Sequence, residues 1–140
     1  MIYNIFEQAP EDELFGACER NDVGVIVRVP FDEGALTGRI GPGAEFPEGD
    51  FRNEYFSGER ALDKVDERVR AILDDLGIER DDLAEVALRY VLSRPEVSTV
   101  IPGMRSVRNV ERNAALGDGA GLPEDQLRAL KAHRWDAAAA

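Results

Sequence analysis

Apolar residues along the chain predict three short strands separated by helices. Residues 23–29 form a nearly continuous β-branched run that ends at Pro30, and residues 97–101 form a second run that stops at Pro102. Residues 1–6 have strand propensity but little length, so they predict a short or truncated strand. Because a continuous β-branched run is typical of a parallel strand with helices on both faces, we expect both faces of the 23–29 strand to be buried.

Five segments predict helices, because their apolar residues recur at intervals of three and four. The helix that begins close to Ser106 carries Val107, Val110 and Ala114 on its expected buried side. The other four are expected over residues 9–21, over residues 59–76, from residue 81 or 82 to just before Pro95, and from residue 122 onward with Leu127 and Leu130 facing inward.

The segment from residue 30 to about residue 58 is rich in Gly, Pro and acidic residues and has no apolar period. A loop of this length inside a compact domain is usually functional or disordered, and short helical turns fit within it. The order strand, helix, strand, long loop, two helices, strand and two helices predicts an α/β fold with parallel strands. Three parallel strands leave two exposed edges, so we expect further strands to complete the sheet.

The composition is that of one globular domain. The chain has 140 residues, of which 44% are hydrophobic, and this is enough for a proper core. We expect a single domain over residues 1–136 and a disordered tail over residues 137–140, where four alanines follow one another.

The net charge and the single cysteine and histidine argue against several classes of function. The formal net charge of −11 argues against a nucleic-acid or anionic-membrane surface, so an anion has to be met by local basic residues. No segment has the apolar length of a transmembrane helix or the pattern of a signal peptide, so a cytoplasmic protein is expected. The single cysteine, Cys18, excludes an internal disulfide and is expected to be a core thiol. With one histidine, His133, no metal site is expected.

The junction of the 97–101 strand with the following helix is a candidate anion site. A helix that starts just after a strand points unpaired N–H groups and the positive end of its dipole outward, and Arg105 adds a guanidinium there. Spacing alone leaves two interpretations open. The junction binds a phosphate, or it is an ordinary turn in which Arg105 and Arg108 are simply solvated.

Four stretches together resemble the C-terminal part of the aldo-keto reductases. These stretches are residues 3–8 (YNIFEQ), 30–39 (PFDEGALTGR), 84–92 (AEVALRYVL) and 101–113 (IPGMRSVRNVERN). The family consists of NAD(P)H-dependent oxidoreductases built on a (β/α)8 barrel, a fold that needs ~250 residues. The resemblance implies that this chain begins inside the sixth strand and holds the seventh and eighth, so that it forms an incomplete barrel of about three parallel strands with flanking helices.

The same resemblance places the catalytic residues outside this chain. The catalytic Asp, Tyr, Lys and His of the family lie on the first half of the barrel, and none of their positions is present here. Tyr3, Tyr55, Tyr90 and His133 do not match those positions, and His133 is expected to have a surface or packing role. No catalytic residue is therefore assigned, and the chain alone is expected to be inactive.

The resemblance implies a cofactor site made from two stretches. The residues after the seventh strand would contact the nicotinamide and pyrophosphate; these are Arg28, Pro30, Phe31, Asp32, Gly34, Leu36, Thr37, Gly38 and Arg39. Gly34 and Gly38 allow close approach of the backbone, and Arg39 can neutralise a phosphate. Relatives usually have an aromatic residue where Arg28 stands, although a guanidinium also stacks on a flat ring.

The second stretch would surround the 2'-phosphate and the adenine. It comprises Gly103, Met104, Arg105, Asn109, Arg112 and Asn113. By the resemblance, Arg105 pairs with the phosphate and Asn113 hydrogen-bonds the adenine. Arg112 stands where many relatives have an acid, which favours NADPH over NADH. Arg52 in the long loop is a further candidate that would clamp the cofactor from above.

Three interpretations of function follow. The first is the cofactor-binding part of an NADPH-dependent oxidoreductase that transfers hydride between the nicotinamide and a small carbonyl or alcohol substrate. The second is a non-catalytic NADPH-binding or regulatory module. The third concerns the length of the chain, which would be the product of a truncated or interrupted reading frame with a complementary N-terminal half as its partner.

Overall fold

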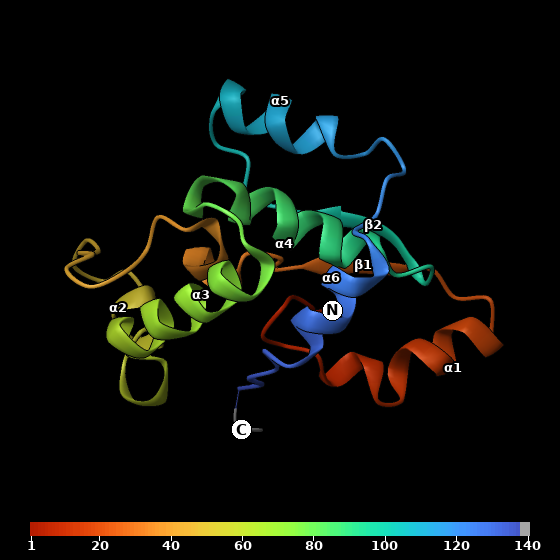
Figure 1. The fold of residues 1–140 in the computed structure, drawn as a ribbon, viewed down its shortest axis with the longest axis horizontal. Helices are drawn as coiled ribbons and strands as arrows, with labels where there is room; N and C mark the ends of the chain where they lie inside the picture. Colours follow the sequence, from red (N-terminus) through yellow and green to blue (C-terminus); the bar gives the residue numbers. More distant parts are fainter. Residues whose placement is uncertain (138–140) are drawn as a thin grey trace.

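Two parallel strands form the centre of the structure, a computed structural model that describes residues 1–137 (Figure 1). Strand β1 (Val25–Arg28) pairs with strand β2 (Val97–Ile101) in parallel, with a shift of register between Val25 and Ile26. Ile2 adds one isolated parallel bridge to Arg28. The α/β class and the parallel pairing are as predicted.

The expected third strand is reduced to that single bridge, so the prediction of about three strands is wrong by one. The cause lies at Asn4, whose side-chain Oδ1 accepts hydrogen bonds from the backbone N–H groups of Phe6 and Glu7, both at 2.9 Å. The backbone N–H of Asn4 also donates to the Glu7 carbonyl at 3.2 Å. These local bonds fold the chain into a turn and compete with strand pairing.

The helices lie close to their predicted places. The α-helices are α1 (Leu14–Arg20), α2 (Arg52–Tyr55), α3 (Leu62–Leu76), α4 (Leu83–Leu92), α5 (Val107–Ala115) and α6 (Glu124–Lys131), and the 3-10 helices are η1 (Ala9–Glu11), η2 (Asp32–Thr37), η3 (Gly58–Arg60) and η4 (Arg80–Asp82). Gly77 ends α3 with φ +62°, and the Ser106 hydroxyl caps α5 by accepting from the Asn109 N–H at 3.2 Å. Among the described residues, no helix is both long and apolar enough to cross a membrane.

The helix expected over residues 9–21 is divided in two. Its first turn is the 3-10 helix η1, and α1 begins only at Leu14, because Glu13 leaves the helical region with φ −141°. Cys18 is buried in α1, as predicted for a core thiol. The 30–58 segment contains η2 and α2, which confirms short helical turns within the long loop.

The core lies on one face of the sheet. Val25 and Val27 of β1 point into it, and α4 packs against β2 while α3 packs against α6 (Figure 1). The apolar stripes of these helices are buried as predicted, and so is Leu130 of α6. His133, just beyond α6, is buried and its Nε2 lies 2.9 Å from Asp75 Oδ2, which confirms a packing role.

The expectation that both faces of the 23–29 strand are buried is wrong. Side chains alternate along β1, and Ile26 on the second face is 57% exposed. On β2, Ile101, the register partner of Arg28, is also 57% exposed. The apolar run is that of a fully covered strand, but no element within residues 1–137 covers this face.

The prediction that Val107 and Val110 lie on the buried side of α5 is also wrong. Val107 is 74% exposed and Val110 is 44% exposed, and α5 has no buried residue. Helix α5 stands apart from the other helices at the top of Figure 1. A cavity of about 400 Å³ lies between α5 and the α4–β2 layer, so the stripe meets a hollow instead of a packed neighbour.

The expected tail begins within the described part of the chain. The backbone N–H of Ala137 donates to Glu7 Oε1 at 2.7 Å, so this residue is held against the N-terminal region. Residues 138–140, which complete the predicted tail, lie outside the described residues.

Candidate functional site

Two adjoining hollows form a cleft between η2 and the junction of β2 with α5, here called the η2–α5 cleft. Their volumes are about 310 and 800 Å³, and both are lined by Phe31, Thr37, Gly103 and Asn109. The fold therefore brings together the two stretches that the sequence predicts for a cofactor, although more than sixty residues separate them in the chain.

The smaller hollow is rich in hydrogen-bond donors. Arg39, Arg112 and Asn113 line it, together with the carboxylates of Asp81 and Glu85. Guanidinium and amide groups are the donors that recognise phosphate oxygens and the polar edge of a base. This part of the cleft can therefore hold a phosphate next to a heterocyclic ring.

The larger hollow lies between the β2–α5 junction and the long loop. Arg105 lines it from one side, and Asp50, Phe51 and Arg52 line it from the other. Asp50 accepts hydrogen bonds from Arg52 Nε at 3.0 Å and Nη2 at 2.7 Å, and these bonds lower the pKa of Asp50 to about 2, with a smaller contribution from the charge of Arg105. Arg52, predicted to reach over the cofactor, thus lies on the wall of the cleft.

The backbone at the start of η2 and just before it is held in an unusual conformation. Val29, Asp32 and Glu33 have φ of +57°, +48° and +56°, a region that residues with a Cβ rarely occupy. Gly34 follows with φ +110°, and a Cβ there would lie 2.6 Å from Ile40 Cδ1. Each left-handed residue other than glycine costs on the order of 1–3 kcal/mol, so the surrounding contacts must hold this turn in place.

Two of the predicted cofactor residues turn their side chains into the protein. Leu36 is fully buried in the core. Asp32 is also fully buried, and its carboxylate accepts from the Tyr55 hydroxyl at 2.6 Å and from Arg60 Nη1 at 2.7 Å. Burial raises the pKa of the Asp32 carboxyl, and Arg60 and Tyr55 oppose that effect. Both residues thus support the cleft from behind.

Of the remaining predicted residues, Pro30 lines the larger hollow, whereas Met104, Gly38 and Arg28 do not line the cleft. Met104 lines the neighbouring cavity under α5, and Gly38 with φ +74° packs so closely on Arg80 that a Cβ would clash. Arg28 is exposed on the uncovered face of the sheet, where its charge acts on Glu33. Burial raises the pKa of the Glu33 carboxyl, and Arg28 opposes that rise.

Sequence reasoning missed the acidic and aromatic members of the cleft wall. Asp50 and Phe51 were not predicted, although they directly precede Arg52, which was predicted. The spacing of Asp50 and Arg52 is the signal that could have found them, because an acid two residues before an arginine can fix its guanidinium.

The donor set of the cleft fits a phosphorylated dinucleotide. The chain has 28 acidic and 17 basic residues, yet within residues 1–137 no carboxylate pairs with Arg39, Arg105 or Arg112. The backbone at Gly103 faces open space, with no atom within 4 Å of a Cβ built there. Three cations without an ion pair thus lie around an open backbone, which suits an anion with several charges. Asp81 and Glu85 line the smaller hollow beside Arg39 and Arg112 and offset part of this charge.

Comparison with protein families gives one assignment over nearly the whole chain. Residues 1–134 match the family model described as "Aldo/keto reductase family". Among curated proteins, the chain is 25% identical over 114 residues to the aldo-keto reductase yakc of Schizosaccharomyces pombe, whose name specifies NADP(+). That match covers 76% of this chain and 32% of the relative.

A second curated relative has a different printed role. The chain is 28% identical over 118 residues to a probable voltage-gated potassium channel subunit beta of Arabidopsis thaliana, a match that covers 79% of this chain and 35% of the relative. The chain thus spans about a third of the length of the curated relatives that it matches.

Solved structures resemble the fold over almost all of this chain. The holo form of an aldo-keto reductase from Bacillus halodurans is 25% identical and superposes with a TM-score of 0.67, covering 96% of this chain and 40% of its own. A glycerol dehydrogenase from Gluconobacter oxydans, at 21% identity and a TM-score of 0.70, covers 94% of this chain and 40% of its own, and shows the fold alone.

Proposed function

Since the chain belongs to the aldo/keto reductase family, we propose that it forms the NADPH-binding side of an oxidoreductase barrel. One observation carries the proposal. The 30–39 loop and the 103–113 junction, both predicted to contact one cofactor, line the same cleft. The NADP(+) in the name of one relative also supports the choice of nucleotide.

Each of the two stretches has a role in this proposal. Arg105 and Arg112 bind the 2'-phosphate, and Asn113 hydrogen-bonds the adenine. Thr37 and Arg39 hold the pyrophosphate, and the open backbone at Gly103 allows it to approach. When bound, the nicotinamide supplies the hydride for a small carbonyl substrate.

Catalysis needs groups that this chain does not provide. Reduction of a carbonyl requires a proton donor beside the substrate, and the resemblance places the family's catalytic Asp, Tyr, Lys and His outside the matched stretches. We therefore propose that the chain alone is inactive and that its partner is a complementary N-terminal half. The uncovered sheet face with Ile26 and Ile101 supports this, because such a half would cover it.

The nucleotide assignment is tested by titrating the purified chain with NADPH and NADH and following nucleotide fluorescence. Arg105→Ala removes a charge-assisted hydrogen bond of about 1.5–3 kcal/mol, so the Kd for NADPH should rise about tenfold or more. The Kd for NADH should change little, because NADH has no 2'-phosphate. Arg108→Ala, an exposed neighbour outside the cleft, is the control. Equal losses for both nucleotides would contradict the assignment.

A second candidate is a non-catalytic NADPH-binding or regulatory module. The similarity to a probable potassium channel subunit beta favours it. The two candidates differ once the barrel is complete, since an enzyme oxidises NADPH when a carbonyl compound is added. Absorbance of NADPH in the presence of a complementary half and a panel of aldehydes distinguishes them, because a regulatory module binds NADPH without consuming it.

A further inference from the structure

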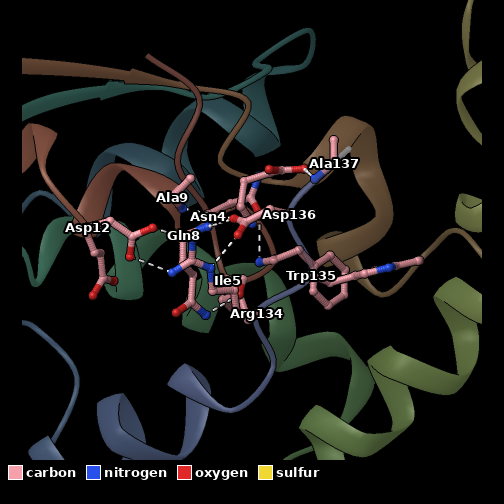
Figure 2. Close-up of polar contacts among 12 residues, drawn as sticks. Asn4, Ile5, Gln8, Ala9, Asp12, Arg134, Trp135, Asp136 and Ala137 are labelled. Carbon is pink, nitrogen blue, oxygen red and sulfur yellow. Dashed lines mark hydrogen bonds and ion pairs between the residues drawn. The ribbon is translucent and has the colours of Figure 1, made fainter. Parts of the chain in front are cut away.

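The C-terminal segment, residues 134–137, is clasped by the N-terminal turn (Figure 2). The Trp135 N–H donates to the Phe6 carbonyl at 2.8 Å. Asp136 Oδ1 accepts from the N–H groups of Gln8 at 2.7 Å and Ala9 at 3.0 Å. These bonds, with those of Arg134 to Asp12 at 2.6 and 2.7 Å, form what we call the C-terminal clasp.

Arg60 connects the clasp to the interior. Its guanidinium lies over the Trp135 ring, 4.5 Å from the centroid, and its Nη2 donates to the Trp135 carbonyl at 2.7 Å. The same Nη2 pairs with the Glu7 carboxylate, while Nη1 donates to Asp32 Oδ2 at 2.7 Å. One buried side chain thus contacts the C-terminal segment, the N-terminal turn and the start of η2.

Asp32 links Arg60 to the cleft. It lies in the left-handed turn between Val29 and Gly34. Among the described residues, only Arg60 and Tyr55 donate hydrogen bonds to its buried carboxylate. Phe31 and Gly34, on either side of it, line the η2–α5 cleft. Because the turn is strained, its conformation depends on the anchor that holds Asp32.

We infer that Arg60 is a positioning residue that couples docking of the C-terminal segment to the shape of the nucleotide cleft. The inference rests on the proposed NADPH site, which it extends to a residue that does not touch the cleft. Arg60 keeps the turn around Asp32 in its binding conformation, and Trp135 holds Arg60 in place. Coupling between two sites is reciprocal, so bound nucleotide also strengthens docking of residues 134–137.

Two variants test the coupling without leaving Asp32 as an uncompensated buried charge, which a truncation of Arg60 would do. Arg60→Lys keeps a cation beside Asp32 but loses the planar fork that reaches Asp32 and Trp135 together. Trp135→Leu keeps Arg60 and removes the ring beneath it. Arg68→Ala is the matched control, since Arg68 also lies over the Trp135 ring, at 4.2 Å, but does not contact Asp32.

Amide hydrogen exchange of the whole chain, with and without NADPH, gives the readout. We expect both variants to speed exchange in residues 29–38 and to raise the Kd for NADPH at least about fivefold, the lower end of typical couplings. Exchange in α3 and α4 should change little, and the control should change neither quantity by more than about twofold. In the unaltered chain, NADPH should slow exchange in residues 134–137.

The outcomes separate this inference from the proposed function. If the unaltered chain binds no NADPH but the variants still loosen residues 29–38, the proposed function fails and the link from Arg60 to the turn stands. If NADPH binds the unaltered chain and both variants equally well, the coupling is overturned while the proposed function stands. Faster exchange throughout α3, α4 and the turn alike would show general destabilisation and would also overturn the coupling.

Discussion

The N-terminal turn with its clasp and the α5 region differ in where their contacts are made. Around Phe6, Arg60 and Trp135, aromatic rings and charges find their partners within the chain. At α5, Val107 and Val110 are exposed, and Arg105 and Arg112 pair with no carboxylate among the described residues. One region has its contacts completed within the chain, and the other presents exposed apolar and charged groups.

Under the proposed function, this difference separates residues that stabilise the fold from residues that bind the nucleotide. Burial of apolar surface gives about 25 cal/mol per Å², so most of the folding free energy lies where side chains are covered. Binding residues need open space and uncompensated charge, and they contribute less to stability. The comparison predicts that equal truncations have very unequal effects in the two regions.

The largest expected effect is at Phe6. Phe6→Ala removes a fully buried ring that packs edge-to-face on Trp135 and should lower the free energy of unfolding by about 3–5 kcal/mol. Val107→Ala in the exposed face of α5 should change it by less than about 0.5 kcal/mol. Urea unfolding followed by circular dichroism measures both. Similar losses of unfolding free energy at the two sites would contradict the difference between the two regions.

A smaller effect is expected at Glu11, which ties η1 to α4. Its Oε1 accepts from the hydroxyls of Tyr3 at 2.6 Å and Tyr90 at 3.0 Å. Burial alone would raise the pKa of Glu11, but these hydrogen bonds and the charges of Lys131 and Arg94 outweigh it and lower the pKa below 4.5. The carboxylate therefore stabilises the fold fully above pH 4.5, and this contribution is lost as the pH falls through the lowered pKa.

Glu11→Gln should lower the stability at pH 7 by about 1 kcal/mol, the size of one hydrogen bond. The difference between variant and unaltered chain should shrink as the pH falls below 4.5. Thermal unfolding over a pH series measures this, with Glu59→Gln, a side chain that is 91% exposed, as the control. A difference that is constant with pH would mean that Glu11 acts by packing alone.

The fold was predictable where short-range rules decide it. Gly77 and Ser106 mark helix ends through their own backbone and side-chain bonds, and residues 97–101 form a strand as their β-branched run predicts. Which face of a strand is covered by other elements was not predictable in the same way. The pattern of β1 indicates apolar faces, but which face is covered depends on elements elsewhere, and Ile26 remains exposed.

The site, too, was predictable only in part, because contacts between residues far apart in the sequence shape it. The resemblance identified both stretches of the cleft, and the structure brings them together, while the role of each residue stays a prediction. Asp32 shows the limit, because its partner Arg60 lies 28 residues away and Arg60 meets Trp135 another 75 residues on. Contacts over such separations depend on the tertiary fold and leave no local pattern in the sequence.

The smallest expected change in stability concerns the uncovered sheet face. Ile26→Lys places a charge where the side chain is already exposed, so the free energy of unfolding should change by less than about 0.5 kcal/mol. Fluorescence of the dye ANS, which binds apolar patches, should fall, and the solubility should rise. Val27→Lys, on the buried face of the same strand, should unfold the chain. Unchanged ANS fluorescence in Ile26→Lys would show that another surface binds the dye.

Trp135 is the only tryptophan of the chain, and it sits between the guanidinium groups of Arg60 and Arg68 and the ring of Phe6. Its emission therefore comes from a single place, and nearby cations and solvent both alter it. The molecule therefore carries its own optical probe where its two ends meet, and a change in the docking of residues 134–137 would alter this emission without an added label.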